Sequence, residues 1–188
     1  IKNAQAMRLL FSPSDSQKVT GVQIYHRGKE RQVTATSEVI LAAGAFGSPH
    51  LLELSGIGRP DILKPAGIEV RHVLDGVGEH LSDHFLTRLT WRLAPNSSLN
   101  ETSRGIALLK EIARYALFRK GSLSLTAGLL AGFVSSDPNE TRPDIQYHIA
   151  HASFANPARR IFDRFPGLTI GPCPLRPRSR GYVHIRSS

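Results

Sequence analysis

The stretch EVILAAGAFGSPHLLELSGIG, residues 38–58, decides the fold of this chain. Its apolar opening predicts a buried strand over residues 39–43. Ser48 followed by Pro49 predicts a helix N-cap and the first helical residue, and Gly56 predicts the helix end. The sequence thus predicts a strand, a glycine turn and a helix whose N-terminus points back at the turn. Such a junction offers unpaired N–H groups and about half a positive charge to an anion.

Four consecutive small residues, Ala42, Ala43, Gly44 and Ala45, stand where the predicted strand meets the predicted helix. Gly44 would let the backbone approach a ligand closely. The alternative is that Gly44 only makes the turn. We favour the ligand interpretation because the whole junction is built from small side chains.

Residues 44–58 resemble the second signature of the glucose-methanol-choline (GMC) flavoprotein oxidoreductases, with its Ser-Pro pair and its Ser-Gly-Ile-Gly ending. Four other segments resemble the same family, and the one at residues 76–84 is close to the form seen in choline oxidases. These segments are 18–22, 76–84, 143–148 and 174–181. The resemblance therefore runs essentially from end to end of the chain.

The resemblance implies a mixed α/β and α+β fold in two parts. Residues 1–85 would be the later part of a Rossmann-like FAD-binding domain, and residues 86–188 the first part of an antiparallel-sheet substrate-binding domain. Local patterns agree with this division. We expect strands at 7–11, 19–25 and 32–37 around a polar turn, then a short helix at 60–64 and a strand at 70–73. In the second part we expect strands at 86–93, 145–150 and 182–186, and a helix capped by Ser103 with one apolar face.

The chain is expected to be the central part of a longer enzyme. The family's FAD domain opens with a Gly-x-Gly-x-x-Gly fingerprint, which does not occur here, and its catalytic His lies near its C-terminus. We therefore expect the chain alone to be inactive. We also expect it not to fold stably alone, because residues 39–43 would lack flanking strands and expose an open sheet edge.

The resemblance assigns FAD contacts to Ala6, Ala43, Gly44 and His84. Ala6 falls where the family usually has a Val whose backbone meets the adenine, and His84 follows Asp83 in a loop expected near the flavin. The alternative for His84 is that it braces this loop by hydrogen bonds. His184 is expected on the surface of a strand. No catalytic residue and no metal ligand is assigned within the chain.

The implied function is oxidation of CH–OH groups, with hydride transfer from an alcohol to FAD, as in choline and alcohol dehydrogenases or aryl-alcohol oxidases. The implied partners are a small-molecule alcohol and an electron acceptor, either oxygen or a quinone. Two alternatives stay open: a hydroxynitrile lyase that keeps FAD without net redox chemistry, and a catalytically inert truncated product. Flavin bleaching by alcohols would distinguish the oxidoreductase from the lyase, and salt-dependent nucleic-acid binding without flavin retention would favour the inert product.

Composition bears on four further properties: nucleic-acid binding, membrane spanning, disulfide bonding and secretion. The net charge is +9, but Lys and Arg are spread along the chain, so we expect no specific nucleic-acid binding. No apolar run approaches the ~20 residues that span a bilayer. The single cysteine, Cys173, excludes an internal disulfide and is expected to be packed. Three glycosylation sequons, at Asn96, Asn100 and Asn139, fit a secreted protein, although location inside or outside the cell stays open.

Overall fold

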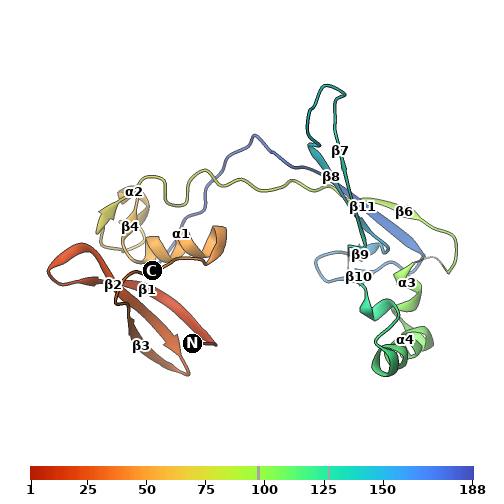
Figure 1. The fold of residues 1–188 in the computed structure, drawn as a ribbon, viewed down its shortest axis with the longest axis horizontal. Helices are drawn as coiled ribbons and strands as arrows, with labels where there is room; N and C mark the ends of the chain where they lie inside the picture. Colours follow the sequence, from red (N-terminus) through yellow and green to blue (C-terminus); the bar gives the residue numbers. More distant parts are fainter. Residues whose placement is uncertain (97, 127) are drawn as a thin grey trace. The chain divides into compact units, whose positions relative to one another are not determined.

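The structure is a computed structural model that describes residues 1–96, 98–126 and 128–188. It forms two compact units, coloured along the sequence in Figure 1. The first comprises Ile1–Ser82 and Arg178–Ser188, and the second Asp83–Pro177. The expected boundary after residue 85 lies close to this division, except that Arg178–Ser188 packs with the first unit. The assignment of the two parts to FAD and to substrate stays a prediction.

An antiparallel sheet of three strands opens the first unit. Its strands are β1 (Ala4–Ser12), β2 (Asp15–His26) and β3 (Lys29–Thr34), in the order β1-β2-β3. The β2–β3 turn holds Arg27 at φ 51° and Gly28 at φ 78°. Positive φ at both central residues gives a tight turn whose backbone twist matches the right-handed twist of the two flanking strands. The predicted pair of strands joined by a polar turn is confirmed.

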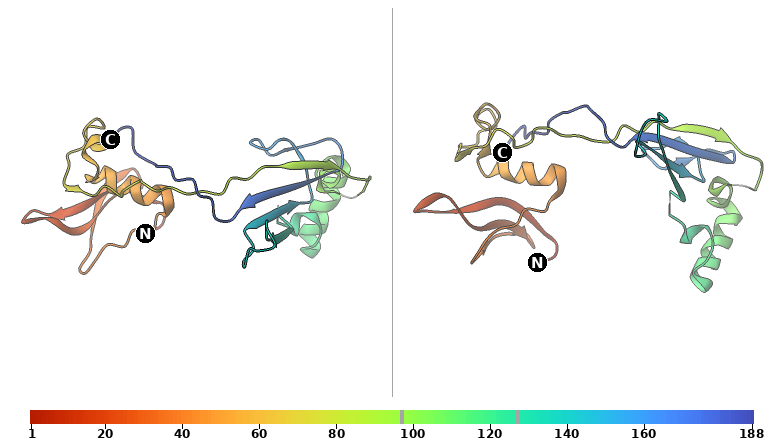
Figure 2. Two further views of the ribbon diagram at one scale, coloured as in Figure 1. Left: turned by 90° about the horizontal axis from the view of Figure 1, so that it is seen from above. Right: turned by 45° about the horizontal axis from the view of Figure 1, so that its top comes forward.

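Helix α1 (Gly44–Leu54) lies against one face of this sheet, next to β1 (Figure 1, Figure 2). The buried Ser55 hydroxyl joins them: it accepts the Leu9 N–H at 2.8 Å and donates to the Leu51 carbonyl at 2.6 Å. Gly56 follows at φ 84°, so the predicted helix end is confirmed.

The predicted start of α1 was wrong. The helix begins at Gly44, and Pro49 lies inside it rather than at its first position. The Ser48 hydroxyl does not cap downstream N–H groups but accepts the N–H of Ala43 at 3.1 Å. Gly44 opens the helix at φ 81°, and Pro49, in the second turn, cannot donate a hydrogen bond to the Ala45 carbonyl, so α1 lacks that bond.

The predicted strand at residues 39–43 was also wrong. These residues join β3 to α1 without strand structure, and Ile40 is 78% exposed. A strand exists through hydrogen bonds to a neighbour. Within the described residues no strand pairs with this segment. Its apolar side chains are therefore not buried as a core: Val39 and Leu41 are only half-buried.

The rest of the first unit is built from short elements. Strand β4 (Ile57–Gly58) pairs in parallel with β5 (His72–Val73), and α2 (Pro60–Leu63) lies between them in sequence. The short helix and strand expected here are confirmed with slightly different bounds. The strand expected at 182–186 was wrong: this segment makes single backbone bonds to a loop, such as the Val183 N–H to the Gly78 carbonyl at 2.7 Å.

The second unit is built on a four-stranded antiparallel sheet in the order β6-β11-β8-β7. These strands are β6 (Leu89–Arg92), β11 (Gly167–Pro174), β8 (Ile145–Ala150) and β7 (Leu130–Val134). Strands β9 (Phe154–Asn156) and β10 (Ile161–Phe162) form a separate pair. The antiparallel sheet expected here is confirmed, and Cys173 is buried on β11.

Helices α3 (Leu99–Thr102) and α4 (Gly105–Phe118) and the 3₁₀ turn η1 (Ser122–Ser124) complete this unit. Ser103, the predicted cap of α4, instead ends α3, and α4 begins after Arg104. The predicted apolar face of α4 is exposed: Ile106 and Leu117 are each 74% exposed.

Asn100 is the polar centre of the second unit and is fully buried. Its amide nitrogen donates to the Ser153 hydroxyl and to the Phe165 carbonyl, each at 2.9 Å. Its amide oxygen accepts the Ser153 N–H at 3.0 Å. The sequon at Asn100 is therefore closed to glycosylation in the folded protein. Asn139 is exposed in a loop, and the sequon at Asn96 includes residue 97, which lies outside the described residues.

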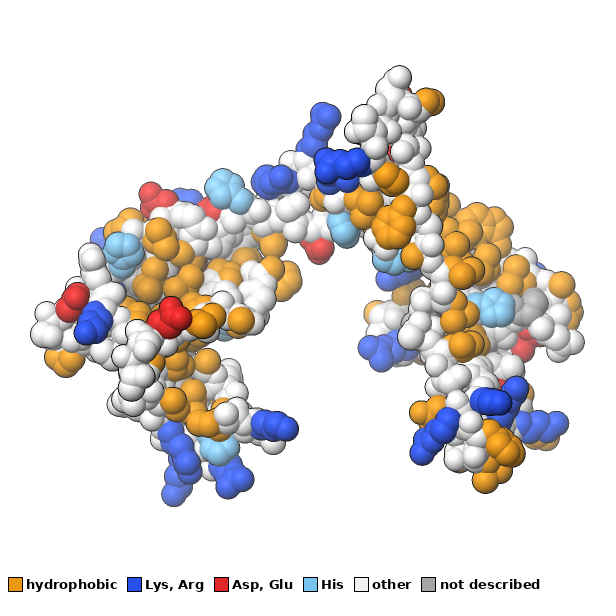
Figure 3. All heavy atoms as spheres, in the orientation of Figure 1, with side chains coloured by type: hydrophobic (Ala, Val, Ile, Leu, Met, Phe, Trp, Pro, Cys, Tyr) orange, Lys and Arg blue, Asp and Glu red, His pale blue; other side chains and the backbone are white. Residues whose placement is uncertain are grey.

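No described helix is long and apolar enough to cross a membrane. On the face drawn in Figure 3, Lys and Arg side chains stand in several separate groups over both units.

Candidate functional site

A cavity of about 660 Å³ lies in the first unit where α1 faces the Gly76–Ser82 loop. Its walls come from the N-terminal half of α1, from that loop and from Val183. The loop is the segment that resembles the family motif, and α1 carries the signature. The two motifs that the sequence singled out therefore enclose one space.

A second cavity, of about 320 Å³, brings together two predicted FAD contacts. Ala6 enters it from β1 and Ala43 from the start of α1. Gly44 follows Ala43 at φ 81°, and a Cβ built on it would meet no atom within 4 Å. The chain thus brings Ala6 and Ala43 to one cavity, and Gly44, which does not line that cavity, faces open space at the helix N-terminus. Their contact with FAD stays a prediction.

His84 belongs to the second unit. Its backbone N–H is bonded to the Asp83 carboxylate at 2.8 Å, and its ring Nε2 lies 3.2 Å from the Leu175 carbonyl. Within the second unit these bonds hold His84 to Asp83 and to the residue that follows β11, in line with the alternative interpretation. They leave its contact with FAD untested.

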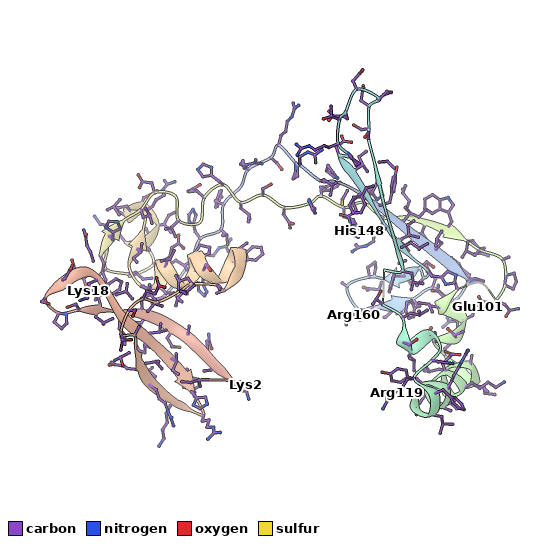
Figure 4. The ribbon with its side chains drawn as sticks, in the orientation of Figure 1. Lys2, Lys18, Glu101, Arg119, His148 and Arg160 are labelled. Carbon is purple, nitrogen blue, oxygen red and sulfur yellow. The ribbon has the colours of Figure 1, made fainter. Side chains whose placement is uncertain are left out.

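Two other histidines, His80 and His148, lie at the larger cavity and on the sheet of the second unit. His80 lines the 660 Å³ cavity with backbone φ 59°. His148 lies on β8 with its side chain exposed (Figure 4). Among the described residues no cluster of three or more His, Cys, Asp or Glu side chains is placed to hold a metal ion.

An ion-pair network that the sequence did not reveal lies behind the wall of the 660 Å³ cavity formed by Glu79 and Val183. Glu53 on α1 is fully buried, and its Oε1 lies 2.6 Å from Nδ1 of His184. The other ring nitrogen of His184 lies 3.2 Å from Oε1 of Glu79. The expectation that His184 lies on a strand surface was wrong, because its side chain is 9% exposed. One signal was available: a carboxylate inside the apolar run of α1 requires a partner when buried.

Arg59 extends this network to the protein surface. Its guanidinium lies 2.9 Å from the Glu79 carboxylate and 2.6 Å from that of Asp61. Burial alone would raise the pKa of Glu79, but hydrogen bonds from Arg59 and His184 outweigh it and hold that pKa below its ordinary value. The hydrogen bond from Arg59 likewise lowers the pKa of Asp61. Both carboxylates in turn raise the pKa of Arg59.

Acid is expected to destabilise the first unit as the pH falls below about 4.5, the ordinary pKa of Glu79. Because the folded protein holds the pKa of Glu79 and of Asp61 below their ordinary values, the unfolded chain binds more protons in acid. The stabilisation is complete above those ordinary values and is lost as the pH falls through the lowered ones. Urea midpoints measured between about pH 6 and about pH 3 test this. Glu79→Gln should flatten the dependence, and an unchanged slope in that variant would contradict the assignment.

Residues 1–86 match the family model described as GMC oxidoreductase. The alcohol dehydrogenase [acceptor] of Pseudomonas putida is 35% identical over 196 residues, covering 100% of this chain and 34% of that protein. The oxygen-dependent choline dehydrogenase of Photobacterium profundum is 35% identical over 178 residues, covering 92% of this chain and 30% of that protein. The chain therefore spans about a third of the length of these relatives.

Solved structures share the fold. A crystal structure of formate oxidase matches with a TM-score of 0.83 at 23% identity, covering 100% of this chain and 39% of that one. A fungal aryl-alcohol oxidase matches with a TM-score of 0.67 at 21% identity, covering 95% of this chain and 37% of that one. These matches confirm the expected mixed fold. The family-model match over residues 1–86 and the two relatives show that this chain is similar to the GMC oxidoreductases.

Proposed function

We propose that the protein carrying this chain is an FAD-dependent oxidoreductase that transfers hydride from the CH–OH group of a small alcohol to the flavin. The observation that carries the proposal is the meeting of two family motifs, α1 and the Gly76–Ser82 loop, around one cavity. The named activities of the relatives, alcohol and choline dehydrogenation, support the substrate class. In this proposal residues 1–85 serve FAD and residues 86–188 serve the substrate.

The residues around the start of α1 fit a bulky, phosphate-bearing cofactor. Ala6, Ala43 and Gly44 present little side-chain volume to the open space beside them. The first turn of α1 also has N–H groups without helical acceptors and the positive end of the helix dipole, both of which favour a pyrophosphate. When bound, FAD would supply the hydride acceptor.

The chain's own part in the reaction is binding and orientation. Ala6, Ala43 and Gly44 would let the nucleotide side of FAD approach the backbone. His84, whose ring Nε2 lies 3.2 Å from the Leu175 carbonyl, is proposed as a further contact with FAD. No residue of this chain is proposed as the base that takes the hydroxyl proton.

Gly44→Ala is expected to weaken flavin binding about tenfold, which is about 1.4 kcal/mol. The new methyl would enter space that holds no protein atom, so it would obstruct only a ligand. Gly28→Ala is the matched control: Gly28 has φ 78°, near the 81° of Gly44, and a Cβ there also meets nothing within 4 Å. Both variants should lose about 1 kcal/mol of stability from backbone conformation. Flavin dissociation constants, measured by fluorescence, should change only in Gly44→Ala; equal values in both variants would contradict the contact.

Product formation tests the proposed reaction and its acceptor. The full-length gene product should convert a primary alcohol to an aldehyde, with hydrogen peroxide formed if oxygen is the acceptor and a quinone dye reduced if it is not. A hydroxynitrile lyase would instead release cyanide from a cyanohydrin and leave the alcohol untouched. Cyanohydrin cleavage without alcohol oxidation would overturn the proposed function.

A further inference from the structure

Each ring nitrogen of His184 faces the carboxyl group of a glutamate. Nδ1 lies 2.6 Å from Oε1 of Glu53, and Nε2 lies 3.2 Å from Oε1 of Glu79. An ionised carboxylate accepts hydrogen bonds and donates none, and a neutral imidazole carries a single N–H. A neutral His184 could therefore satisfy only one of the two contacts. Both are satisfied when both ring nitrogens carry protons.

The bonding of the two acids bears on this proton count. Glu53 accepts the Ile185 N–H at its second oxygen, Oε2, at 2.9 Å, which leaves Oε1 to face His184. Glu79 also accepts from Arg59, and these hydrogen bonds lower its pKa. A protonated Glu53 that donates from Oε1 to Nδ1 would satisfy the same contacts, and the protonation of the ring separates the two arrangements.

The charges around His184 favour the extra proton. Glu53 faces it from α1 and Glu79 from the loop, while Arg59 and Asp61 stand behind Glu79. With a charged imidazole this group of five sums to −1, and with a neutral one to −2. Two neighbours complete the surroundings: the Tyr182 ring stacks on His184 at a centroid distance of 5.4 Å, and His50 lines a small cavity that Glu53 and His184 also line.

The network holds the segment Tyr182–Arg186 at three successive residues. The Val183 N–H bonds to the Gly78 carbonyl at 2.7 Å, the His184 ring joins Glu53 and Glu79, and the Ile185 N–H bonds to Glu53. Val183 also forms part of the wall of the 660 Å³ cavity, beside Gly78 and Glu79. The position of this wall therefore depends on the bridge.

We propose that His184 is a positioning residue: as an imidazolium bridging Glu53 and Glu79, it locks the Tyr182–Arg186 segment and the Gly76–Ser82 loop onto α1. Loss of its proton breaks one of the two contacts and releases this wall of the cavity. The lock stands on the geometry alone. Its effect on flavin binding rests on the proposed function.

Hydrogen exchange and nitrogen NMR of the full-length gene product test the lock. In histidine-labelled protein at about pH 6, both ring nitrogens of His184 should carry protons that exchange slowly with solvent. Amides of residues 76–82 and 182–186 should lose protection as the pH rises from about 6 towards 9, after correction for intrinsic exchange, because histidine changes charge in this region. A singly protonated ring at about pH 6, or protection that does not change with pH, would overturn the proposal.

A charge-removing variant gives an independent test. Glu53→Gln keeps the side-chain shape but removes the charge, and it should lower protection of the Val183 and Ile185 amides at least tenfold at about pH 6. Glu69→Gln is the matched control, since it removes the same charge at an exposed position of the same unit. Equal protection in the two variants would overturn the lock. If Glu53→Gln does not fold, the NMR result on the unaltered protein decides.

These readouts need no flavin, so the lock and the proposed function can fail separately. A colourless protein whose amide protection depends on pH would support the lock and contradict the proposed function. A flavin-loaded protein whose residues 182–186 exchange independently of pH would remove the lock alone.

Discussion

Asn100→Ala is expected to lower the stability of the second unit by about 4 kcal/mol. Asn100 is fully buried and joins the Ser153 backbone and hydroxyl to the Phe165 carbonyl. Alanine would leave these groups inside the unit without a partner and without water. Each buried polar group stranded in this way costs about 1–3 kcal/mol, and at least two are stranded here.

Asn139→Ala is the matched control, because Asn139 carries the same side chain in an exposed loop, where its amide nitrogen donates to the Asp137 carboxylate at 2.9 Å. It should change stability by less than about 0.5 kcal/mol. Urea unfolding of the two variants of the full-length gene product, followed by circular dichroism, makes the comparison. Similar midpoints for both variants would show that Asn100 does not organise this unit.

Gly78→Ala is expected to cost at least about 2 kcal/mol and to detach the Tyr182–Arg186 segment. Gly78 has φ 76°, a conformation that costs an alanine about 1 kcal/mol. Its new Cβ would also collide with the Val183 carbonyl oxygen and lie 2.6 Å from Nδ1 of His184. The Val183 backbone cannot withdraw without breaking its own bond to the Gly78 carbonyl.

Gly76→Ala controls for this change two residues away in the same loop. A Cβ on Gly76 would meet no atom within 4 Å, and its φ is not positive. Thermal unfolding and proteolysis near residue 182 should therefore affect Gly78→Ala and spare Gly76→Ala. Equal behaviour of the two variants would show that residues 182–186 do not pack on Gly78 in solution.

Elements governed by neighbouring residues could be predicted from the sequence. The Arg27-Gly28 turn, the helix end at Gly56 and strand β8 depend on local conformational preference and on alternation. The start of α1 could not, because Ser48 has an acceptor role toward Ala43 that competes with capping. Residues 39–43 were predicted as a strand from their apolar character alone, but a strand also needs a partner.

The site was predictable only in part. The resemblance to the family placed Ala6 and Ala43 near one ligand, and the structure brings both to one cavity. The burial of Glu53 within the signature pointed to a partner, but the identity of that partner, His184, could not be foreseen, because 131 positions separate the two. At Asn100 the sequence was misleading: a sequon is typical of exposed sites, yet the Asn100 side chain is fully buried.

The visible absorption spectrum of the purified full-length gene product tests the central claim most directly. The account predicts an oxidised flavin spectrum that is bleached when a primary alcohol is added without oxygen and that returns when oxygen or a quinone is added. A flavin that alcohols cannot bleach, or a colourless protein that takes up no FAD, would contradict it.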